Sequence, residues 1–391
     1  MSRFHGLDAC RAAAMLLGLF FHGAVSFMTT DIGWAIRDRS THIGVDGFIW
    51  ICHTFRMPVF FLLGGFFGRL VYLKLGAAGF IRHRAKRILL PFVVTLLPLM
   101  PSLLVLWRWG MSRSGPRQIH PFGMKVPSLD LAELTPSPGH LWFLYYLMMI
   151  LALLLVVAVV ARRLPLDGIL RGVDGLMRAV IRFRLVAFVM AVPTAVTLYF
   201  MKSLEVETPV DFIPQLRIVA FYAVYSGFGW ILHRQAGQVA EFGRLLWIPL
   251  VLVAAILVPL GMIVDRSVQT GASLASPWAR VGALYLSALF GWSMVLLFLG
   301  AFVRWGERPR PWVAYLSDAS YWCYLIHVPI VITFQILVAD LAWPGPIKYA
   351  MVMAATVGIC LASYHAFVRY TFIGATLNGK RERPLPASVT P

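Results

Sequence analysis

Charged residues are scarce in this chain of 391 residues, and acidic residues are scarcer than basic ones. Only 13 % of the residues are charged and 59 % are hydrophobic, whereas a soluble domain carries about 25 % charged and 45–50 % apolar residues. So much apolar surface cannot be hidden from water in one core, which excludes a soluble enzyme. Several windows of about 20 residues lack interior charge and are long enough to cross about 30 Å of hydrocarbon. The sequence therefore predicts an all-α fold, a polytopic membrane helical bundle.

Cysteine is also rare. The four cysteines lie in apolar stretches, without a CxxC or Cys/His spacing, at Cys10, Cys52, Cys323 and Cys360. This pattern predicts small buried side chains and no disulfide framework. The chain also lacks a P-loop, an HExxH motif, a dinucleotide fingerprint and a nucleophile elbow. We therefore expect no metal site.

Hydropathy predicts about ten transmembrane helices. Their approximate ranges are 9–29, 46–70, 88–107, 140–161, 185–201, 214–232, 245–264, 280–303, 316–338 and 347–368. Ten spans place both termini on one side of the membrane. Lysine and arginine are about twice as frequent in the segments on that side as in the opposite loops, so the positive-inside rule predicts that both termini are cytoplasmic.

The net charge of +18 follows mainly from this topology, and it indicates contact with anionic membrane lipid rather than with nucleic acid. We expect one integral-membrane domain over residues 1–376 and a disordered cytoplasmic tail over residues 377–391. The loop from Arg108 to Gly139 is rich in Pro, Ser and Gly and is long enough to cover a site as a lid.

The first predicted span carries three ionisable residues, although each charge at the bilayer centre costs about 2.5–3.5 kcal/mol. His22 lies eleven positions after Arg11, a rotation of about 20° more than three full turns. Asp8 lies one turn before Arg11, so the three residues form one polar stripe. The Asp8–Arg11 pair either fixes the helix end or serves a site. A neutral histidine at mid-membrane depth favours a general base.

The second span combines His53 and Arg56, one turn apart, with Pro58 and the pair Gly64–Gly65. Proline frees a backbone carbonyl, and glycines allow close helix packing at depth. Packing alone explains the glycines, but it does not explain the arginine.

A dense cationic segment, Arg82 to Arg87, follows the second span. It fits either positive-inside anchoring or phosphate recognition by guanidinium groups.

In the ninth predicted span, Ser320, Tyr324 and His327 stand at positions i, i+4 and i+7 and form one polar stripe on a helix that Pro329 kinks. A polar stripe on a buried helix indicates either a lined cavity or hydrogen bonds between helices.

Three of these motifs, in this order, resemble those of the acyltransferase family 3 of membrane-bound acyltransferases. Arg11 and His22 match its Arg-x10-His signature, and Arg84 and Arg87 match its Arg-x-x-Arg pair. The stretch from Ser320 to Pro329 matches its Ser-Tyr-x-x-Tyr-Leu-x-His-x-Pro motif at every fixed position.

Further stretches are similar to one branch of that family, which is understood to place succinyl groups on osmoregulated periplasmic glucans. They include His53-Thr54-Phe55-Arg56-Met57 and His140-Leu141-Trp142-Phe143-Leu144. Gly64 departs from the family pattern, which usually has serine before the glycine that matches Gly65.

The resemblance implies an enzyme of the bacterial inner membrane that moves an acyl group from cytoplasmic acyl-CoA to a saccharide hydroxyl outside. It implies catalytic roles for His22, Arg11, Asp8, His327 and Tyr324. It implies donor binding by Arg84, Arg87, Arg56, Arg69, His53 and Ser320. In this scheme His22 is the general base, oriented by His327 or Tyr324, or accepts the acyl group itself. Tyr324, Arg56 or His53 would stabilise the thioester oxyanion.

Several alternatives stay open at this point. A secondary transporter of a small anionic solute explains intramembrane charges equally well, although it does not explain three spaced motifs. The donor is succinyl-CoA or acetyl-CoA, and the acceptor is a glucan or another cell-envelope saccharide or lipid-linked compound. The sequence does not distinguish a monomer from a homo-oligomer, because small residues pack helices within and between chains alike.

Overall fold

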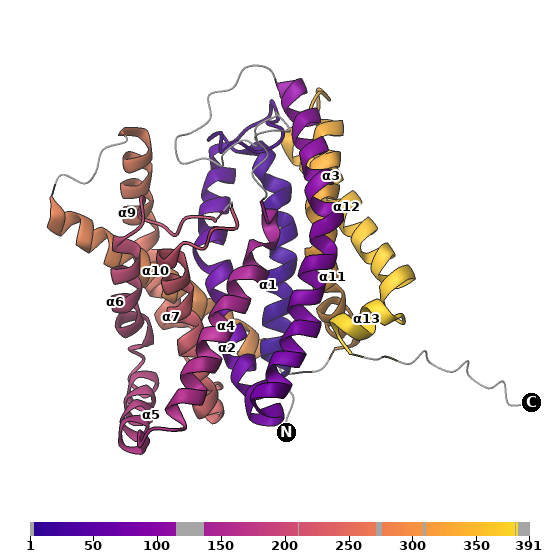
Figure 1. The fold of residues 1–391 in the computed structure, drawn as a ribbon. Coiled ribbons are helices and arrows are strands. Elements are labelled where there is room, and N and C mark those ends of the chain that lie inside the picture. The colour runs from indigo at the N-terminus through magenta and orange to yellow at the C-terminus, as the bar shows by residue number, and fades with distance from the viewer. Residues whose placement is uncertain are drawn as a thin grey trace, which may run out of the picture. The chain divides into compact units, whose positions relative to one another are not determined.

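A computed structural model describes residues 4–114, 137–209, 211–270, 276–306, 308, 310–379 and 381. Every regular element within these residues is a helix (Figure 1), which confirms the predicted all-α fold. The chain forms two compact units. Unit 1 comprises Met1–Ala14, Phe48–Arg82 and Pro136–Arg310, and unit 2 comprises Met15–Gly47, His83–Thr135 and Pro311–Pro391. Helices α1 (His5–Ala24) and α2 (Ile43–Arg84) contribute residues to both units.

Unit 1 is built around the long helix α10, which contacts α6, α8 and α9, while α7 contacts α4 and α6 (Figure 1). Its elements beyond α1 and α2 are η4 (Gly139–Leu141), α4 (Trp142–Ala161), α5 (Asp167–Arg182), α6 (Val186–Tyr199), α7 (Leu216–Leu232), η5 (His233–Gln238), α8 (Glu241–Arg244), α9 (Trp247–Thr270) and α10 (Pro277–Trp305). Helices α5 and α6 meet at a bend of 118°.

Helices α2 and α7 cross at near-backbone contact, and glycine makes this crossing possible. A Cβ atom added to Gly65 would lie 1.9 Å from the Ser226 carbonyl oxygen, and one added to Gly229 would lie 1.9 Å from that of Leu62. The Ser226 hydroxyl donates to the Phe61 carbonyl oxygen at 2.9 Å. Small residues and interhelical hydrogen bonds are the usual means of helix association in lipid. The predicted packing role therefore explains why a glycine stands at position 65.

Unit 2 packs α11 against α3 and α12. Its elements beyond α1 and α2 are η1 (Val25–Phe27), the π-helical turn η2 (Ala85–Leu89), α3 (Leu90–Ser114), α11 (Pro311–Val338), α12 (Gly345–Ser363), the π-helical turn η6 (Tyr364–Val368) and α13 (Phe372–Leu377).

A buried ion pair fixes the non-helical segment 28–42 of unit 2. Lys348 on α12 donates to both Asp38 carboxylate oxygens, at 2.8 and 2.9 Å, and the two side chains are 1 % and 2 % exposed. Lys348 also donates to the Ala339 carbonyl oxygen at 3.3 Å. A charge removed from water is tolerated only when it is paired and hydrogen-bonded in this way, so the pair ties the segment to α12.

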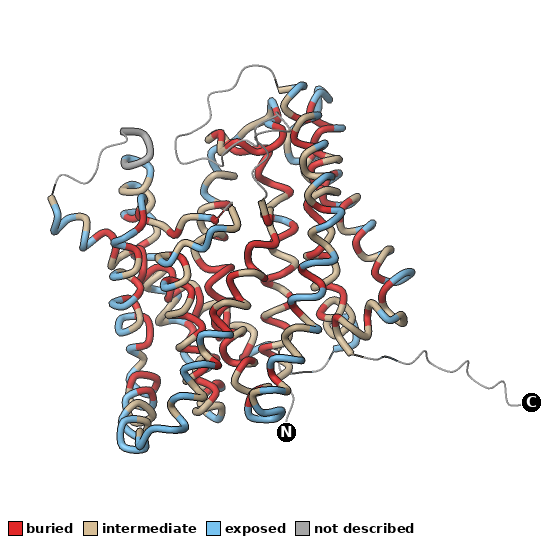
Figure 2. Tube along the Cα trace, viewed as in Figure 1, coloured by how far each residue is buried: buried red, intermediate tan, exposed pale blue. Residues whose placement is uncertain are grey.

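Seven helical stretches of the described residues are long and apolar enough to cross a membrane, or eight if the bent pair α5–α6 forms one span. Figure 2 shows many exposed positions on α9, and large apolar side chains such as Leu97 and Met262 face outward from their helices. The chain is therefore a multi-pass membrane protein. The expected number of about ten spans and the cytoplasmic placement of both termini stay predictions.

The run Ile43–Ser114 explains part of the difference between the seven or eight stretches found and the ten spans predicted. It counts as one stretch of 72 residues, although about 20 residues suffice for a span. Gly76 interrupts it with φ +67° and ψ −176°, a backbone conformation that favours glycine. The two spans predicted at 46–70 and 88–107 lie on either side of this interruption.

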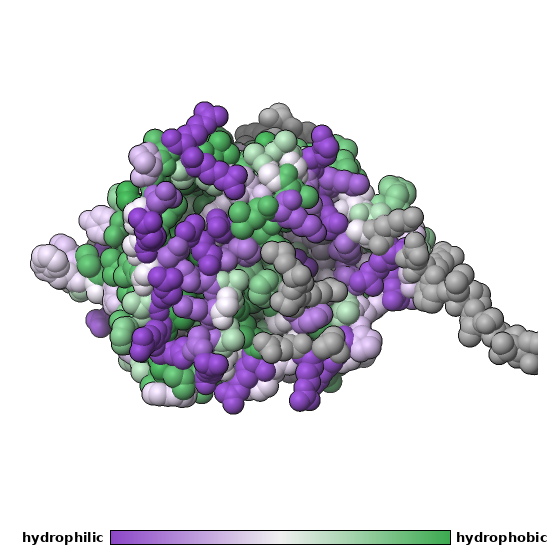
Figure 3. Space-filling model, turned by 90° about the horizontal axis from the view of Figure 1, so that it is seen from below, coloured by the Kyte–Doolittle hydropathy of each residue, from purple (hydrophilic) through white to green (hydrophobic). Residues whose placement is uncertain are grey.

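Hydrophilic residues are spread widely over the face seen in Figure 3, among apolar patches. The expected lid includes residues 115–136, and the expected tail includes residues 382–391, all outside the described residues. The division into one membrane domain over 1–376 and a tail over 377–391 stays a prediction.

The α2–α7 crossing predicts that Gly65→Ala destabilises the protein. The added methyl group would overlap a backbone carbonyl that no side-chain rotation can move, so we expect a loss of about 3 kcal/mol or more in the free energy of unfolding. Gly282→Ala on α10 is the matched control, because nothing lies within 4 Å of the added Cβ. Equal unfolding free energies of the two variants in mixed micelles would contradict the crossing.

Candidate active site

His22 lies near the end of α1 in a cluster of rings contributed by unit 2. The centroid of the His327 ring on α11 is 5.2 Å away, at an interplanar angle of 48°. The Trp34 indole stacks on the His22 ring with a centroid distance of 5.5 Å and an angle of 18°. The structure thus brings together two histidines that are distant in sequence, in the part of the chain where their motifs predicted a site.

His327 is buried, and its Nδ1 lies 2.8 Å from the Tyr324 carbonyl oxygen. A carbonyl oxygen only accepts hydrogen bonds, so Nδ1 carries the proton in this contact and Nε2 is the basic nitrogen of the neutral ring. The Tyr324 ring lies 6.2 Å from that of His327, between centroids. Ser320, the third member of the predicted stripe, donates its hydroxyl to the Ser317 carbonyl oxygen at 2.9 Å. The stripe therefore places Tyr324 and His327 in the cluster, while Ser320 bonds within its own helix.

Arg84 ends α2, and Arg87 lies in the π-helical turn η2 that follows. The Arg87 carbonyl oxygen accepts a hydrogen bond from the Tyr321 hydroxyl on α11 at 2.9 Å. Its guanidinium donates to the Leu377 carbonyl oxygen at 3.3 Å. Such π-helical turns are rare and frequently occur at functional sites. Both arginines belong to unit 2, as does the histidine cluster.

The Asp8–Arg11 pair lies in the first turns of α1, within unit 1. Arg11 Nη2 is 3.6 Å from the Asp8 carboxylate, and the guanidinium also lies 5.8 Å from the centroid of the Phe67 ring on α2. The Arg11 side chain is 43 % exposed, and exposed ion pairs of this kind contribute little to stability. Asp8, Arg11 and His22 all lie on α1, as the sequence predicted.

Two further predicted donor-binding arginines belong to unit 1. Arg56 is buried on α2, one turn from His53. Arg69 lies near Asp174 and Arg234. The Arg234 guanidinium donates to both Asp174 carboxylate oxygens at 2.7 and 2.6 Å. Arg69 is therefore part of a charged cluster with a bidentate ion pair, and its predicted donor-binding role stays a prediction.

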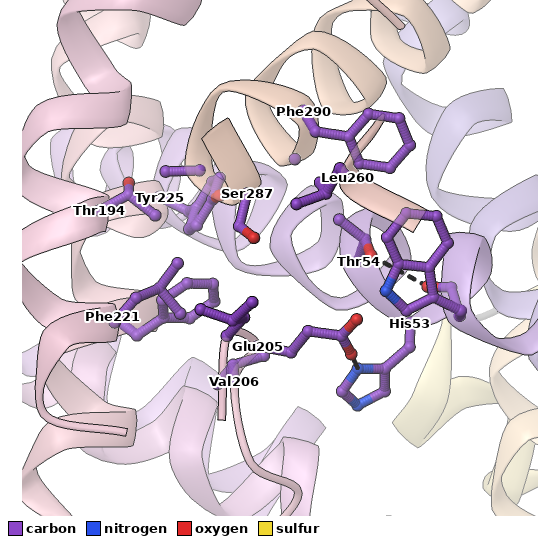
Figure 4. A pocket seen from close by; sticks show the side chains of 15 residues that line it. His53, Thr54, Thr194, Glu205, Val206, Phe221, Tyr225, Leu260, Ser287 and Phe290 are labelled. Carbon is purple, nitrogen blue, oxygen red and sulfur yellow. Dashed lines mark hydrogen bonds and ion pairs between the residues drawn. The ribbon is translucent and has the colours of Figure 1, made fainter. Parts of the chain in front are cut away.

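His53 borders a cavity of about 30 Å³ inside unit 1 (Figure 4). Its Nε2 lies 3.0 Å from the Thr208 hydroxyl, and its Nδ1 lies 3.9 Å from Glu205 Oε2. Glu205 extends toward His53 from the segment between α6 and α7 (Figure 4). Three buried polar atoms that line the cavity have no hydrogen-bond partner among the described residues: Trp50 Nε1, Glu205 Oε1 and Ser287 Oγ. The cavity is large enough to hold a water molecule that would bond to them.

Burial raises the pKa of the Glu205 carboxyl to about 8, because a charge in an apolar cavity is poorly solvated. At neutral pH this residue is therefore mostly a neutral carboxylic acid. Glu205 could not be identified from the sequence, because a single acidic residue in a connecting segment carries no motif. The same holds for Trp34 and Gln335, which contact His22.

A comparison with protein families matches residues 4–365 to a model described as an acyltransferase domain. Among curated proteins, "Glucans biosynthesis protein C" of Escherichia coli SMS-3-5 is 28 % identical over 148 residues, which are 37 % of this chain and 36 % of the relative. Proteins of the same name from Escherichia coli K12 and Shigella dysenteriae serotype 1 are 27 % identical, with the same coverage. The matched stretch thus spans little more than a third of these relatives' length. No solved structure matches the chain.

The raised pKa of Glu205 predicts a pH dependence of stability in unit 1. The neutral acid is favoured in the folded state, so its contribution is fully present below the ordinary pKa near 4.5 and is lost as the pH rises toward about 8. As the pH rises from 4.5 to 8, the unfolding free energy should therefore fall, and Glu205→Gln should remove the share of this fall that comes from the Glu205 carboxyl. Glu207→Gln, a change of the same kind in the same segment, should keep it. An unchanged pH dependence in Glu205→Gln would show that the carboxyl titrates normally.

Proposed function

This chain belongs to the acyltransferase family whose domain model covers residues 4–365, and we propose that it moves a succinyl or acetyl group from cytoplasmic acyl-CoA to a hydroxyl of an extracytoplasmic glucan. The family match and the apolar helices make the chain a membrane acyltransferase. The name of the relatives supports a glucan acceptor. The bacterial inner membrane is the proposed location, because acyl-CoA is available on its cytoplasmic side.

The pairing of His22 with His327 is the observation that carries this proposal. Two imidazole rings with centroids 5.2 Å apart supply a proton acceptor and a neighbouring group that orients it or shares its charge. Hydroxyl groups are weak nucleophiles at neutral pH, so transfer to a saccharide requires a base of this type. Neutral imidazole has the appropriate basicity near pH 7.

In the proposed step, His22 accepts the proton of the acceptor hydroxyl while the hydroxyl oxygen attacks the thioester carbonyl carbon. A carbon–oxygen bond forms, the carbon–sulfur bond breaks, and the coenzyme A thiolate leaves and takes up the proton. An acyl-histidine intermediate on His22 is the second course that the same cluster permits. Tyr324 of this cluster is the proposed donor of a hydrogen bond to the developing oxyanion.

Arg84 and Arg87 are the proposed binding groups for the phosphates of the donor, since guanidinium groups bind phosphate in a bidentate manner. The π-helical turn and the bond from Tyr321 to the Arg87 carbonyl oxygen hold this part of the chain against α11, the helix that carries His327. Donor binding by Arg56, Arg69, His53 and Ser320, and roles for Arg11 and Asp8 in catalysis, stay predictions from the family motifs.

Replacing His22 tests the proposed base. We expect His22→Ala to lower the rate of thiol release from succinyl-CoA and acetyl-CoA, in the presence of a glucan oligosaccharide, by about a thousandfold or more. The melting temperature should change little, because the side chain is only partly buried. His365→Ala in the turn η6 is the matched control and should retain activity. Wild-type activity in His22→Ala would refute the assignment.

Ligand-induced stabilisation tests the donor site. A ligand that binds only the folded protein stabilises it by RT ln(1 + [L]/Kd), about 2.7 kcal/mol at 100 times Kd. We expect coenzyme A, acetyl-CoA or succinyl-CoA to raise the melting temperature of the wild type but not that of Arg84→Ala/Arg87→Ala. The control Arg171→Ala/Arg178→Ala removes two exposed arginines from α5 and should keep the shift. No shift in the wild type at millimolar ligand would argue against an acyl-CoA donor.

A further inference from the structure

We infer that Trp34 and Gln335 are positioning residues that hold His22 in place for proton transfer, an inference that rests on the proposed role of His22. Neither residue belongs to a motif that the sequence analysis singled out. Both are buried in unit 2, with Trp34 5 % and Gln335 1 % exposed. They contact His22 from two directions, the first through the imidazole ring and the second through the backbone.

Gln335 caps the end of the helix that carries His22. Its amide Nε2 donates to the carbonyl oxygens of His22 and Gly23, both at 2.9 Å. The last carbonyl groups of a helix have no partner within it, and α1 ends at Ala24. Unpaired carbonyls would be costly here, because Gly23 and Gln335 are buried and a buried polar group without a hydrogen bond is unfavourable. A single side chain of α11 therefore fixes the backbone of α1 at the position of His22.

Trp34 links this cap to the imidazole ring. Its indole Nε1 donates to Gln335 Oε1 at 2.8 Å, which leaves the amide NH₂ group to face the carbonyls of α1. The indole face stacks on the His22 ring, while its other contacts include the Trp107 ring, 5.2 Å away at 69°. The three residues Trp34, Gln335 and His22 thus form a closed set of contacts.

The segment that carries Trp34 is itself held on several sides within unit 2. The buried Lys348–Asp38 pair ties it to α12, and Trp107 Nε1 donates to the Gly33 carbonyl oxygen at 3.2 Å. Gly110 of α3 allows close contact, since a Cβ there would lie 2.3 Å from the Ala35 carbonyl oxygen. The indole is therefore a fixed surface against which the imidazole is placed.

Two physical effects connect this arrangement to the reaction. A displacement of about 1 Å at a reacting group can cost a factor of about 100 in rate, so a ring held on two sides is a better proton acceptor than a mobile one. An aromatic face also attracts a cation placed over it. The indole therefore stabilises the positive charge that His22 gains when it takes the proton.

The test compares variants that remove hydrogen bonds alone with a variant that also removes the aromatic stack. Trp34→Leu removes the aromatic face and the N–H donor, and we expect kcat for thiol release from acetyl-CoA and succinyl-CoA to fall by about 10- to 100-fold. Trp34→Phe restores a ring and should recover most of that loss. Gln335→Met keeps the length of the side chain but cannot cap the carbonyls, and it should lower kcat by about tenfold. In all three, KM for the donor should stay within about twofold of the wild type.

Trp292→Leu is the matched control for Trp34→Leu. Trp292 is a fully buried tryptophan of unit 1 that stacks on Tyr225 at 4.3 Å and donates from Nε1 to the Thr194 hydroxyl at 2.8 Å. Its loss removes the same kinds of contact and should lower the melting temperature by a similar amount. Because Trp292 belongs to unit 1 and both histidines belong to unit 2, kcat per folded molecule should be retained.

The outcomes separate this inference from the proposed function. If His22→Ala is inactive while Trp34→Leu and Gln335→Met retain the wild-type kcat per folded molecule, the positioning role is wrong and the base assignment stands. If His22→Ala is fully active, the base assignment itself fails. If Trp34→Leu and Trp292→Leu lower kcat by the same factor, and Trp34→Phe does not recover the loss, Trp34 is a general packing residue and the inference is overturned. Should Trp34→Leu fail to fold, Gln335→Met alone decides.

Discussion

Hydrocarbon offers no partner to a polar group, so each one within the membrane-spanning helices must be bonded inside the protein. Burial inside the protein imposes the same requirement on the polar groups of unit 2. The Lys348 ammonium is neutralised by Asp38, the carbonyls that end α1 are capped by Gln335, and His327 bonds to the backbone of its own helix. Each of these bonds also fixes a residue of the histidine cluster or the segment beside it. The means of satisfying buried polar groups are thus the same contacts that shape the proposed active site.

In unit 1 some buried polar groups are hydrogen-bonded within the protein, and others are left without a partner among the described residues. Its helices α2 and α7 approach closely at glycine residues and share a hydroxyl-to-carbonyl bond. Around His53, however, three polar atoms line a small cavity without a partner among the described residues, and Glu205 is held as a neutral acid. Beside this cavity, burial raises the pKa of the Glu205 carboxyl, so we expect its ionisation to change the stability of the unit.

Much of the molecule could be predicted from sequence because hydropathy and spaced motifs are local signals. Each expected span overlaps a helix, and the two histidine motifs meet at the rings of His22 and His327. The residues around them could not be predicted in this way. Trp34 lies in a segment without regular structure, and Gln335 is one glutamine in an apolar helix more than 300 positions away. Their roles depend on a tertiary hydrogen bond, which neither periodicity nor motif spacing encodes.

The most direct test of the account is a double-mutant cycle on the two histidines, measured as kcat/KM for thiol release from acyl-CoA in the presence of acceptor. If His22 and His327 act as one catalytic unit, the variant lacking both should be about as slow as either single variant, because the first replacement already removes the shared function. That strong non-additivity is the predicted result. Independent losses that multiply in the double variant would show that the two rings, although 5.2 Å apart, do not work together.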